Sequence, residues 1–334
     1  MVTHKLLFAS IACLNTVMLL RADKAPAITD LGLGTEILAI NDRGQIAFTA
    51  TDPTNKSRQA ILWENGIRTY LGFLPGDTQS WTADLNNQGQ VVGWTTGTCS
   101  SRAFVWQQGV MTPLGGCSTQ ALGINNRGQI VGSSSENSTS GRAVMWQDGK
   151  MVDLGVPTSN FGSAARAIND RGQIVGQYGI NGLSRAFLWE NGHVTDLGVL
   201  PSSQGCGADD INNQGQVVGW CFVSGFLQAF LWENGIMTGL EHPTGIRSSV
   251  AGHINERGEI VGSASGSDFQ SRAVMWQHGK FFDLTTMIAP SAWRLFASYS
   301  INDRGQVVGL GDVNEPPVDV AFQGFLLDVR GLTH

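Results

Sequence analysis

From about residue 27 onward, the chain alternates short apolar runs with turn residues, and two phrases recur in that pattern. One phrase, at residues 168–176, reads Ile-Asn-Asp-Arg-Gly-Gln-Ile-Val-Gly, and the other, at residues 185–192, reads Arg-Ala-Phe-Leu-Trp-Glu-Asn-Gly. Asn-x-x-Gly between apolar runs predicts a type I turn with Gly in the left-handed conformation, and Glu-Asn-Gly predicts a tight hairpin. A third phrase, Asp-Leu-Gly at residues 196–198, closes the unit. Each repeat therefore predicts four antiparallel strands, A to D.

The repeat period selects the architecture. The Asn-x-x-Gly phrase recurs about every 43 residues, and such a period with four strands is typical of a β-propeller blade. In strand C, Phe187 and Trp189 point to one face while Ala186 and Leu188 point to the other, so both faces are apolar. Sheets covered on both faces fit blades that stack around a ring. The glycines of the seven copies are Gly44, Gly89, Gly128, Gly172, Gly215, Gly258 and Gly305.

The two ends of the chain complete each other. The last repeat supplies strands A, B and C, whereas residues 27–32 form an isolated strand D ahead of the first repeat. Together they predict an all-β, seven-bladed β-propeller with four antiparallel strands per blade, closed by the N-terminal strand. An open stack of sheets is the alternative, but it leaves two unpaired edges. The single domain spans 27–334, with blades at about 33–72, 73–115, 116–155, 156–198, 199–240, 241–284 and 285–334 plus 27–32.

These phrases resemble the HAF repeat of extracellular bacterial proteins, and the resemblance covers nearly all of the chain from Ala27 onward. The family is named for a His-Ala-Phe tripeptide. This chain departs from it, because Arg or Gln precedes Ala103, Ala186 and Ala229. The resemblance implies export and a propeller-like architecture. It implies no activity and supplies no catalytic residues.

Composition narrows the function classes. Gly contributes 43 of 334 residues and charged residues only 14%, while 42% are hydrophobic, so the chain has enough apolar surface for a core. The net charge is −6 without a basic cluster, which gives no electrostatic footprint for nucleic acid. We find no apolar tract long enough to predict a transmembrane helix.

Residues 1–26 look like an export signal. A short basic start precedes the mostly apolar residues 6–20, and Ala25-Pro26-Ala27 offers small residues of the kind that a signal peptidase recognises. The alternative is an N-terminal helix that stays on the protein. We expect an exported protein that is periplasmic, cell-surface or secreted.

Four cysteines follow Cys13, an even number that suits an oxidising compartment. Three pairings are open, and proximity in the sequence favours Cys99–Cys117 and Cys206–Cys221; buried free thiols are the alternative. A bulge at the glycine of the A–B turn would place Cys206 and Cys221 on opposite faces of their hairpin. Their spacing fits no zinc motif, so we expect neither metal nor cofactor.

Catalytic motifs of the common hydrolases and nucleotide-binding enzymes are missing from the sequence. On strand A, which lines the channel of a propeller, His253 occupies the position that holds Asp84 and Asp210 in other copies. These three residues and Arg166 are candidates for an acid–base set at the channel mouth. The alternative is a set of solvated residues that a wet channel tolerates.

The D–A connections vary from blade to blade, and variable loops on a rigid scaffold often bind ligands. We expect the ligand-binding residues there, whereas the repeated tryptophans are predicted to be core. The alternative is that the connection residues cap the ends of the blades. The candidates are Trp81, Phe161, Asp209, Trp293, Arg294 and Phe296.

The sequence thus predicts an exported, non-enzymatic propeller that binds an extracellular glycan or peptide through its D–A face. One alternative is a lyase or glycosidase with its site at the channel mouth, acting on an extracellular polymer. A structural surface or matrix protein is another. Convergence of His253, Asp84, Asp210 and Arg166 in one pocket favours the enzyme, and a flat aromatic patch without buried carboxylates favours binding.

Overall fold

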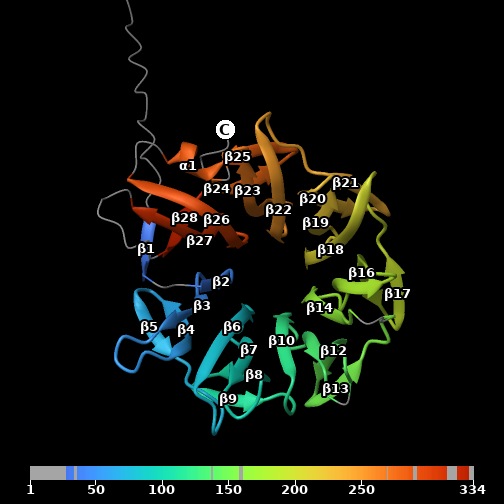
Figure 1. The fold of residues 1–334 in the computed structure, drawn as a ribbon. Helices are drawn as coiled ribbons and strands as arrows, with labels where there is room; N and C mark the ends of the chain where they lie inside the picture. The colour runs from blue at the N-terminus through green and yellow to red at the C-terminus, as the bar shows by residue number, and fades with distance from the viewer. Residues whose placement is uncertain are drawn as a thin grey trace, which may run out of the picture.

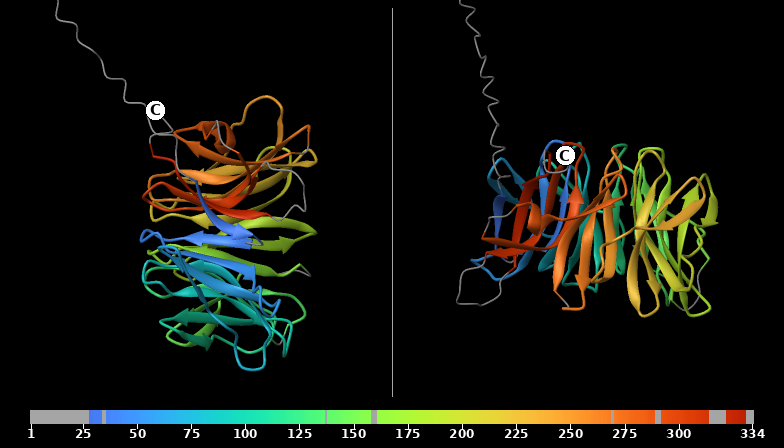
Figure 2. Two further views of the ribbon diagram at one scale, coloured as in Figure 1. Left: turned by 90° about the vertical axis from the view of Figure 1, so that its left-hand side faces the viewer. Right: turned by 90° about the horizontal axis from the view of Figure 1, so that it is seen from above.

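A computed structural model describes residues 28–33, 36–136, 138–157, 161–268, 270–288, 292–313 and 322–330. The proposed export signal lies outside these residues. The described chain forms seven four-stranded antiparallel sheets arranged as blades around a central channel (Figure 1). Figure 2 shows that the strands run between the two faces of the ring. The prediction of an all-β, seven-bladed propeller is confirmed.

In six blades the strands follow the chain order from the channel outward. Their bounds are β2 (Glu36–Ile40), β3 (Ile46–Thr51), β4 (Arg58–Glu64) and β5 (Ile67–Tyr70); β6 (Gln79–Leu85), β7 (Val91–Thr96), β8 (Arg102–Gln107) and β9 (Val110–Pro113); β10 (Thr119–Ile124), β11 (Ile130–Ser134), β12 (Arg142–Gln147) and β13 (Lys150–Asp153); β14 (Ser163–Ile168), β15 (Ile174–Ile180), β16 (Leu183–Glu190) and β17 (His193–Asp196); β18 (Ser203–Ile211), β19 (Val217–Val223), β20 (Phe226–Glu233) and β21 (Ile236–Gly239); and β22 (Ile246–Ile254), β23 (Ile260–Gly266), β24 (Ser271–Gln277) and β25 (Lys280–Asp283).

The seventh blade joins the two ends of the chain. It contains β26 (Trp293–Ile301), β27 (Gln306–Val313) and β28 (Gln323–Asp328), with β1 (Ile28–Leu33) as its outermost strand. Ile28 pairs with Leu327 and Thr29 with Leu326, and in Figure 1 the blue β1 lies beside the red β28. The short helix α1 (Leu284–Met287) precedes this blade, and the Asp283 side chain caps it by accepting the backbone N–H of Thr285. The expected closure by the N-terminal strand is confirmed.

The A–B hairpins have the predicted turn. In the blade of β14 and β15, the backbone N–H of Gly172 donates to the Asn169 carbonyl (3.0 Å), and that of Asn169 donates to the Gln173 carbonyl (3.0 Å). Gly172 has a φ of +82°, in the left-handed region that glycine tolerates best. We call the end of the channel with the A–B and C–D turns the turn end, and the other, with the D–A connections and B–C loops, the connection end.

Every A strand also contains a second β-bulge that the sequence did not predict. Ile211 lies opposite Val217, but the register shifts between Ala208 and Asp210, so Asp209 is an extra residue. The extra residues of the ring are Ile37, Ala83, Leu122, Arg166, Asp209, Gly252 and Tyr299. A bulge puts two consecutive residues where a regular strand would place one.

This second bulge determines one of the disulfides. With the turn bulge at Gly215 alone, Cys206 and Cys221 would face away from each other. The extra residue Asp209 restores the register, and Cys206 pairs directly with Cys221. The structure contains both favoured disulfides, Cys99–Cys117 and Cys206–Cys221, with Cα atoms 5.8 and 4.0 Å apart.

Hydrophobic clusters fill the spaces between neighbouring blades. Phe187, fully buried on β16, packs in one cluster with Val131 and Ala143 of the preceding blade. Trp146 and Trp276 are each 1% exposed, while Trp189 is half-buried against the same cluster as Phe187. These tryptophans are core residues, as predicted. Within the described residues, no helix has the length and apolarity to cross a membrane.

Candidate functional site

Seven equivalent asparagines link the blades at the turn end of the channel. The Asn169 Oδ1 accepts the backbone N–H groups of Arg171 (3.1 Å) and Gln173 (3.0 Å), so the local bond predicted for this residue is present. Its Nδ2 also donates to the backbone carbonyl of Asn212 in the next blade (3.0 Å). The same inter-blade bond is made by Asn41, Asn86, Asn125, Asn169, Asn212, Asn255 and Asn302. The last of these returns to Asn41 and closes the ring.

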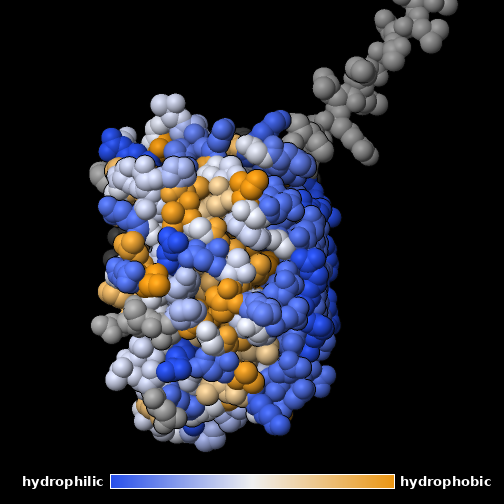
Figure 3. All heavy atoms as spheres, turned by 90° about the vertical axis from the view of Figure 1, so that its right-hand side faces the viewer, coloured by the Kyte–Doolittle hydropathy of each residue, from blue (hydrophilic) through white to orange (hydrophobic). Residues whose placement is uncertain are grey.

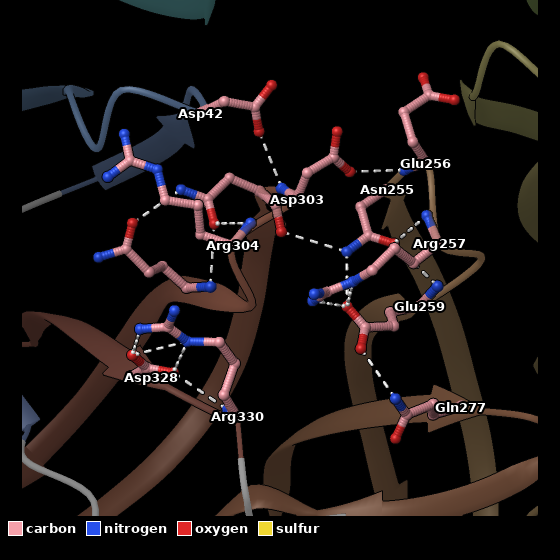
Figure 4. A network of polar contacts seen from close by, with 12 residues as sticks. Asp42, Asn255, Glu256, Arg257, Glu259, Gln277, Asp303, Arg304, Asp328 and Arg330 are labelled. Carbon is pink, nitrogen blue, oxygen red and sulfur yellow. Dashed lines mark hydrogen bonds and ion pairs between the residues drawn. The ribbon is translucent and has the colours of Figure 1, made fainter.

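The residue after each asparagine forms a second ring. The backbone N–H of Asp303 donates to Asp42 (2.8 Å), and that of Glu256 donates to Asp303 (2.9 Å; Figure 4). Burial, followed by like charges of neighbouring carboxylates, raises the pKa of Glu256 and of Asp303. The ring contains Asp42, Asn87, Asn126, Asp170, Asn213, Glu256 and Asp303. Its polar groups bond to one another, so the turn end of the channel holds neighbouring blades together.

The connection end of the channel holds a larger cavity of about 470 Å³, compared with about 150 Å³ at the turn end. Asp84, Asp210 and His253 line both spaces, so they lie where the two meet. The wider cavity is also lined by Trp94, Leu122, Arg166, Asp209, Val250, Gly252, Ser263, Ser298 and Tyr299, among others. Most of the turn-end lining repeats Ile, Asn and Asp from blade to blade, whereas the wider cavity is lined by a greater variety of residue types.

The second bulges supply much of this diversity. Asp209 and Asp210 are consecutive in the chain, yet both line the cavity. In a regular strand their side chains would point to opposite faces. Gly252 and His253 are likewise consecutive, and both line the cavity, as do Tyr299 and Ser300. The bulge thus lets two consecutive residues of one strand line the channel.

Asp84 and Asp210 connect neighbouring blades. The backbone N–H of Ile124 donates to Asp84 (2.9 Å), and that of Ile254 donates to Asp210 (2.9 Å). The His253 Nε2 lies 3.5 Å from the Asp210 carboxylate. Burial raises the pKa of Asp84 to about 6, against the opposing effects of the Ile124 N–H and His253, while the charge of Asp210 adds to the rise.

Asp209 is different, because no hydrogen bond to its carboxylate is found within the described part of the chain. Burial raises its pKa to about 6, the positive charge of Arg166 opposes the rise, and the charge of Asp210 adds to it. Arg166 is itself exposed and forms no ion pair within 4.0 Å among the described residues. Asp209 and Arg166 therefore both have hydrogen-bonding capacity for a ligand.

The structure brings together all four candidates for acid–base chemistry, His253, Asp84, Asp210 and Arg166, and adds Asp209 to them. Two polar atoms of residues that line this cavity are also buried without a hydrogen-bond partner among the described residues: His253 Nδ1 and, on a residue that the sequence did not single out, Ser298 Oγ. Nothing in the repeat marks Ser298, since its orientation depends on the bulge at the next residue.

The aromatic candidates lie elsewhere. Trp81 belongs to strand β6 and stacks on Trp94, with ring centroids 6.0 Å apart. Trp293, Arg294 and Phe296 belong to β26 rather than to a D–A connection. The expected location on connections is wrong for these four residues, and also for Asp209 on β18, because the A strands begin earlier than the repeat phrase indicates. None of the four is among the residues that line the cavity.

Trp293 packs against the core cluster beside α1. The Arg294 guanidinium bonds to Asp312 (3.1 Å) and lies 4.8 Å from the centre of the Phe296 ring. Arg294 and Phe296 thus contact each other on β26. Their role in ligand binding stays a prediction.

Phe161 does lie on a D–A connection, where it is 73% exposed. It lines a separate cavity of about 510 Å³ with Tyr178, Leu183 and Trp220. Figure 3 views the side of the ring that carries β16 and β17, and shows hydrophobic side chains in patches beside a hydrophilic rim.

Among the described residues, we find no group of three His, Cys, Asp or Glu residues arranged to hold a metal ion.

Comparison with known proteins identifies the fold more clearly than the function. A model of a family described as a protein of unknown function (DUF3466) matches residues 116–229, which fall within three consecutive blades. No curated protein matches the chain.

Several solved structures share the fold. An oligogalacturonate lyase from Vibrio parahaemolyticus is 10% identical with a TM-score of 0.61, and the match covers 92% of this chain and 95% of the lyase. A puromycin hydrolase mutant is 11% identical with a TM-score of 0.61, covering 90% of this chain and 52% of the hydrolase. A puromycin-hydrolyzing peptidase from Mycobacterium tuberculosis is 12% identical with a TM-score of 0.59 and the same coverages. The chain thus spans about half the length of the two hydrolases, and at these identities the likeness shows the fold alone.

Proposed function

We propose that the chain is an exported β-propeller that binds an extracellular glycan or peptide in the cavity at the connection end of its channel, without catalysing a reaction. One observation carries the proposal: the blades present different residues to a cavity of about 470 Å³. Specific binding sites are concave, with a few polar groups placed among apolar ones. The turn end repeats the same closed hydrogen-bond pattern in every blade and offers no such asymmetry.

The proposed export is supported by the two disulfides, Cys99–Cys117 and Cys206–Cys221, since disulfides persist in oxidising compartments. Residues 1–26 supply the proposed signal. We also assign the chain to the HAF-repeat family, on the strength of its repeated phrases.

A second candidate function is a lyase or glycosidase acting at the channel mouth. The convergence of Asp84, Asp210, His253 and Arg166 around one cavity favours it, because paired carboxyl groups serve as acid and base in such reactions. A lyase with this fold is among the similar structures. We rank it second, since Asp84 and Asp210 already hold backbone N–H groups of the next blade, which explains their presence structurally.

The test begins with a glycan and peptide array probed with the mature protein, followed by a variant that fills the cavity. Gly252 lines the cavity, and a Cβ there would meet only the Val261 carbonyl oxygen, at 3.9 Å. Gly252→Trp should therefore abolish binding while leaving the melting temperature nearly unchanged. Val110→Trp, on an outer strand where Val110 is 64% exposed, is the matched control and should bind normally.

Full binding by Gly252→Trp would place the ligand site elsewhere and contradict the proposal. Each ligand found on the array is also incubated with the protein and analysed by mass spectrometry. Cleaved product would establish the enzyme and exclude the non-enzymatic proposal.

A further inference from the structure

We propose that the ligand of the channel cavity carries a primary ammonium group among hydroxyl groups, and that it is an amino sugar with a free amine at the end of a glycan. The inference rests on the proposed function, because it names the chemistry of the ligand for that same cavity.

The first step is the charge of the lining. Three carboxyl groups, of Asp84, Asp209 and Asp210, face the cavity, against the guanidinium of Arg166 and the imidazole of His253. Among the described lining residues there is no lysine and no second arginine. A partly buried site with more negative than positive groups attracts a cation and disfavours an anion.

The second step is the position of the carboxyl groups relative to one another. Asp209 and Asp210 reach the cavity from consecutive positions of β18, and Asp84 reaches it from β6. The charge of Asp210 raises the pKa of both Asp84 and Asp209, so Asp210 repels each of the other two carboxylates. An ammonium group between them would offset both this repulsion and the cost of burying Asp209.

The third step is the set of unpaired polar atoms. Ser298 is 3% exposed, and its hydroxyl has no partner among the described residues, nor has the Nδ1 of His253. Both residues line the same cavity as the carboxylates. A buried polar atom without a partner is unfavourable, because it has lost its bonds to water. Hydroxyl groups of a sugar ring would satisfy both atoms.

The aromatic lining completes the choice. Trp94 and Tyr299 lie on the cavity wall, and aromatic rings pack against the apolar face of a sugar as well as against a cation. A polyamine or a lysine side chain would satisfy the carboxylates but would leave Ser298 and His253 unpaired. An amino sugar offers an ammonium group to the carboxylates, hydroxyl groups to Ser298 and His253, and an apolar ring face to the aromatic residues.

The experiment compares three disaccharides that share one linkage and differ only at carbon 2: chitobiose with free amines, its N-acetylated form, and cellobiose. Calorimetry at pH 7 should show at least tenfold tighter binding of the free amine. Equal affinities, or preference for the N-acetylated form, would overturn this inference but would leave glycan binding in the cavity standing. Failure of all three, with neutral or acidic ligands found on the array instead, would also overturn it.

Two variants test the charge directly. Asp209→Asn should reduce the preference for the free amine at least tenfold while changing cellobiose binding less than twofold. Asp148→Asn is the matched control, because it removes the same charge from an exposed C–D turn and should leave all affinities unchanged. Unaltered preference in Asp209→Asn would contradict the proposal, provided that its melting temperature matches the parent.

Arg166→Gln gives a result of opposite sign. Removal of the guanidinium should tighten binding of the free amine several-fold, because a positive charge that acts on Asp209 is gone. A loss of affinity in Arg166→Gln would mean that the ligand presents an anionic group to Arg166, and would overturn the assignment.

Discussion

The two ends of the channel are built from the same seven blades but use their polar groups in opposite ways. At the turn end, Asn169 and its equivalents donate to the next blade around the whole ring, and their neighbours form a second closed ring. At the connection end, Asp209 and the Ser298 hydroxyl remain without hydrogen-bond partners among the described residues. At the turn end, the repeated side chains bond to one another around the ring. At the connection end, the residues differ between blades and leave polar groups available to a ligand.

The second bulge separates the two ends. Between the A–B turn and Asp210, strand β18 keeps the register that the turn sets. From Ala208 toward the start of the strand, the register is shifted by one residue. The shift turns side chains toward the channel that a regular strand would bury between blades. Bulge residues as different as Leu122, Arg166 and Asp209 line the cavity, because a position beside open space constrains the residue type less than a packed core does.

The largest expected effect comes from opening the ring. A chain that begins at residue 34 lacks β1 and exposes the edge of β28. It should lose several kcal/mol of stability, a large part of the total for a typical domain. Thermal unfolding checks this, with a chain that begins at residue 27 as the control. The same melting temperature for both would show that the ring does not need its outermost strand.

Next in size is the loss of one inter-blade asparagine. Asn212 is 2% exposed, and its side chain bonds to the N–H groups of Gln214 and Gln216 and to the Asn255 carbonyl. Asn212→Ala should cost about 2–4 kcal/mol, because it removes the partner of one buried and two partly buried backbone groups. Tyr299→Ala at the connection end should cost less than about 1 kcal/mol, since Tyr299 is 39% exposed. Urea denaturation measures both, and a similar cost for the two would remove the distinction between the ends.

The buried disulfide should have a comparable or smaller effect. The double variant Cys206→Ala, Cys221→Ala should lose about 2–3 kcal/mol, because the sequence separation of 15 closes a short loop. In protein made in an oxidising compartment, peptide mapping without reduction should recover both cross-links. Free Cys206 in such protein would contradict the register that the second bulge imposes.

The smallest effect is a pH dependence at the connection end. The pKa of Asp209 is raised to about 6 from 3.8, so its ionised form is disfavoured in the folded protein. This cost is absent below pH 3.8, grows as the pH rises, and is complete above about pH 6. Asp209→Asn should therefore be more stable than the parent by about 1–2 kcal/mol at pH 8, discounted for screening by channel water.

At pH 4 the two proteins should have nearly the same stability. Asp42→Asn is the comparison at the turn end, where the carboxylate accepts the Asp303 N–H. That variant should not be more stable than the parent, because its carboxylate already has a hydrogen-bond partner. An equal stabilisation of both variants would mean that the unpaired state of Asp209 has no energetic consequence.

The sequence by itself determined the blade. Asn169 with Gly172 specifies the A–B turn, the apolar residues on both sides of Trp189 specify a sheet covered on both faces, and the orphan strand at residues 27–32 specifies how the ring closes. These features are local, since turn chemistry and side-chain alternation act within a few residues and leave a pattern in each copy. The pairing Cys99–Cys117 could also be predicted from the sequence, because the two residues flank one hairpin.

Only the tertiary structure decided what the channel contains. The bulge residues Ala83, Leu122, Arg166, Asp209 and Tyr299 share no chemistry, so no phrase marks them, although the bulge brings them into the channel. The bonds between blades join residues some forty positions apart, as Asn169 and Asn212 are. Such contacts exist only when the ring is closed, since closure sets which residue of the next blade lies within hydrogen-bonding distance.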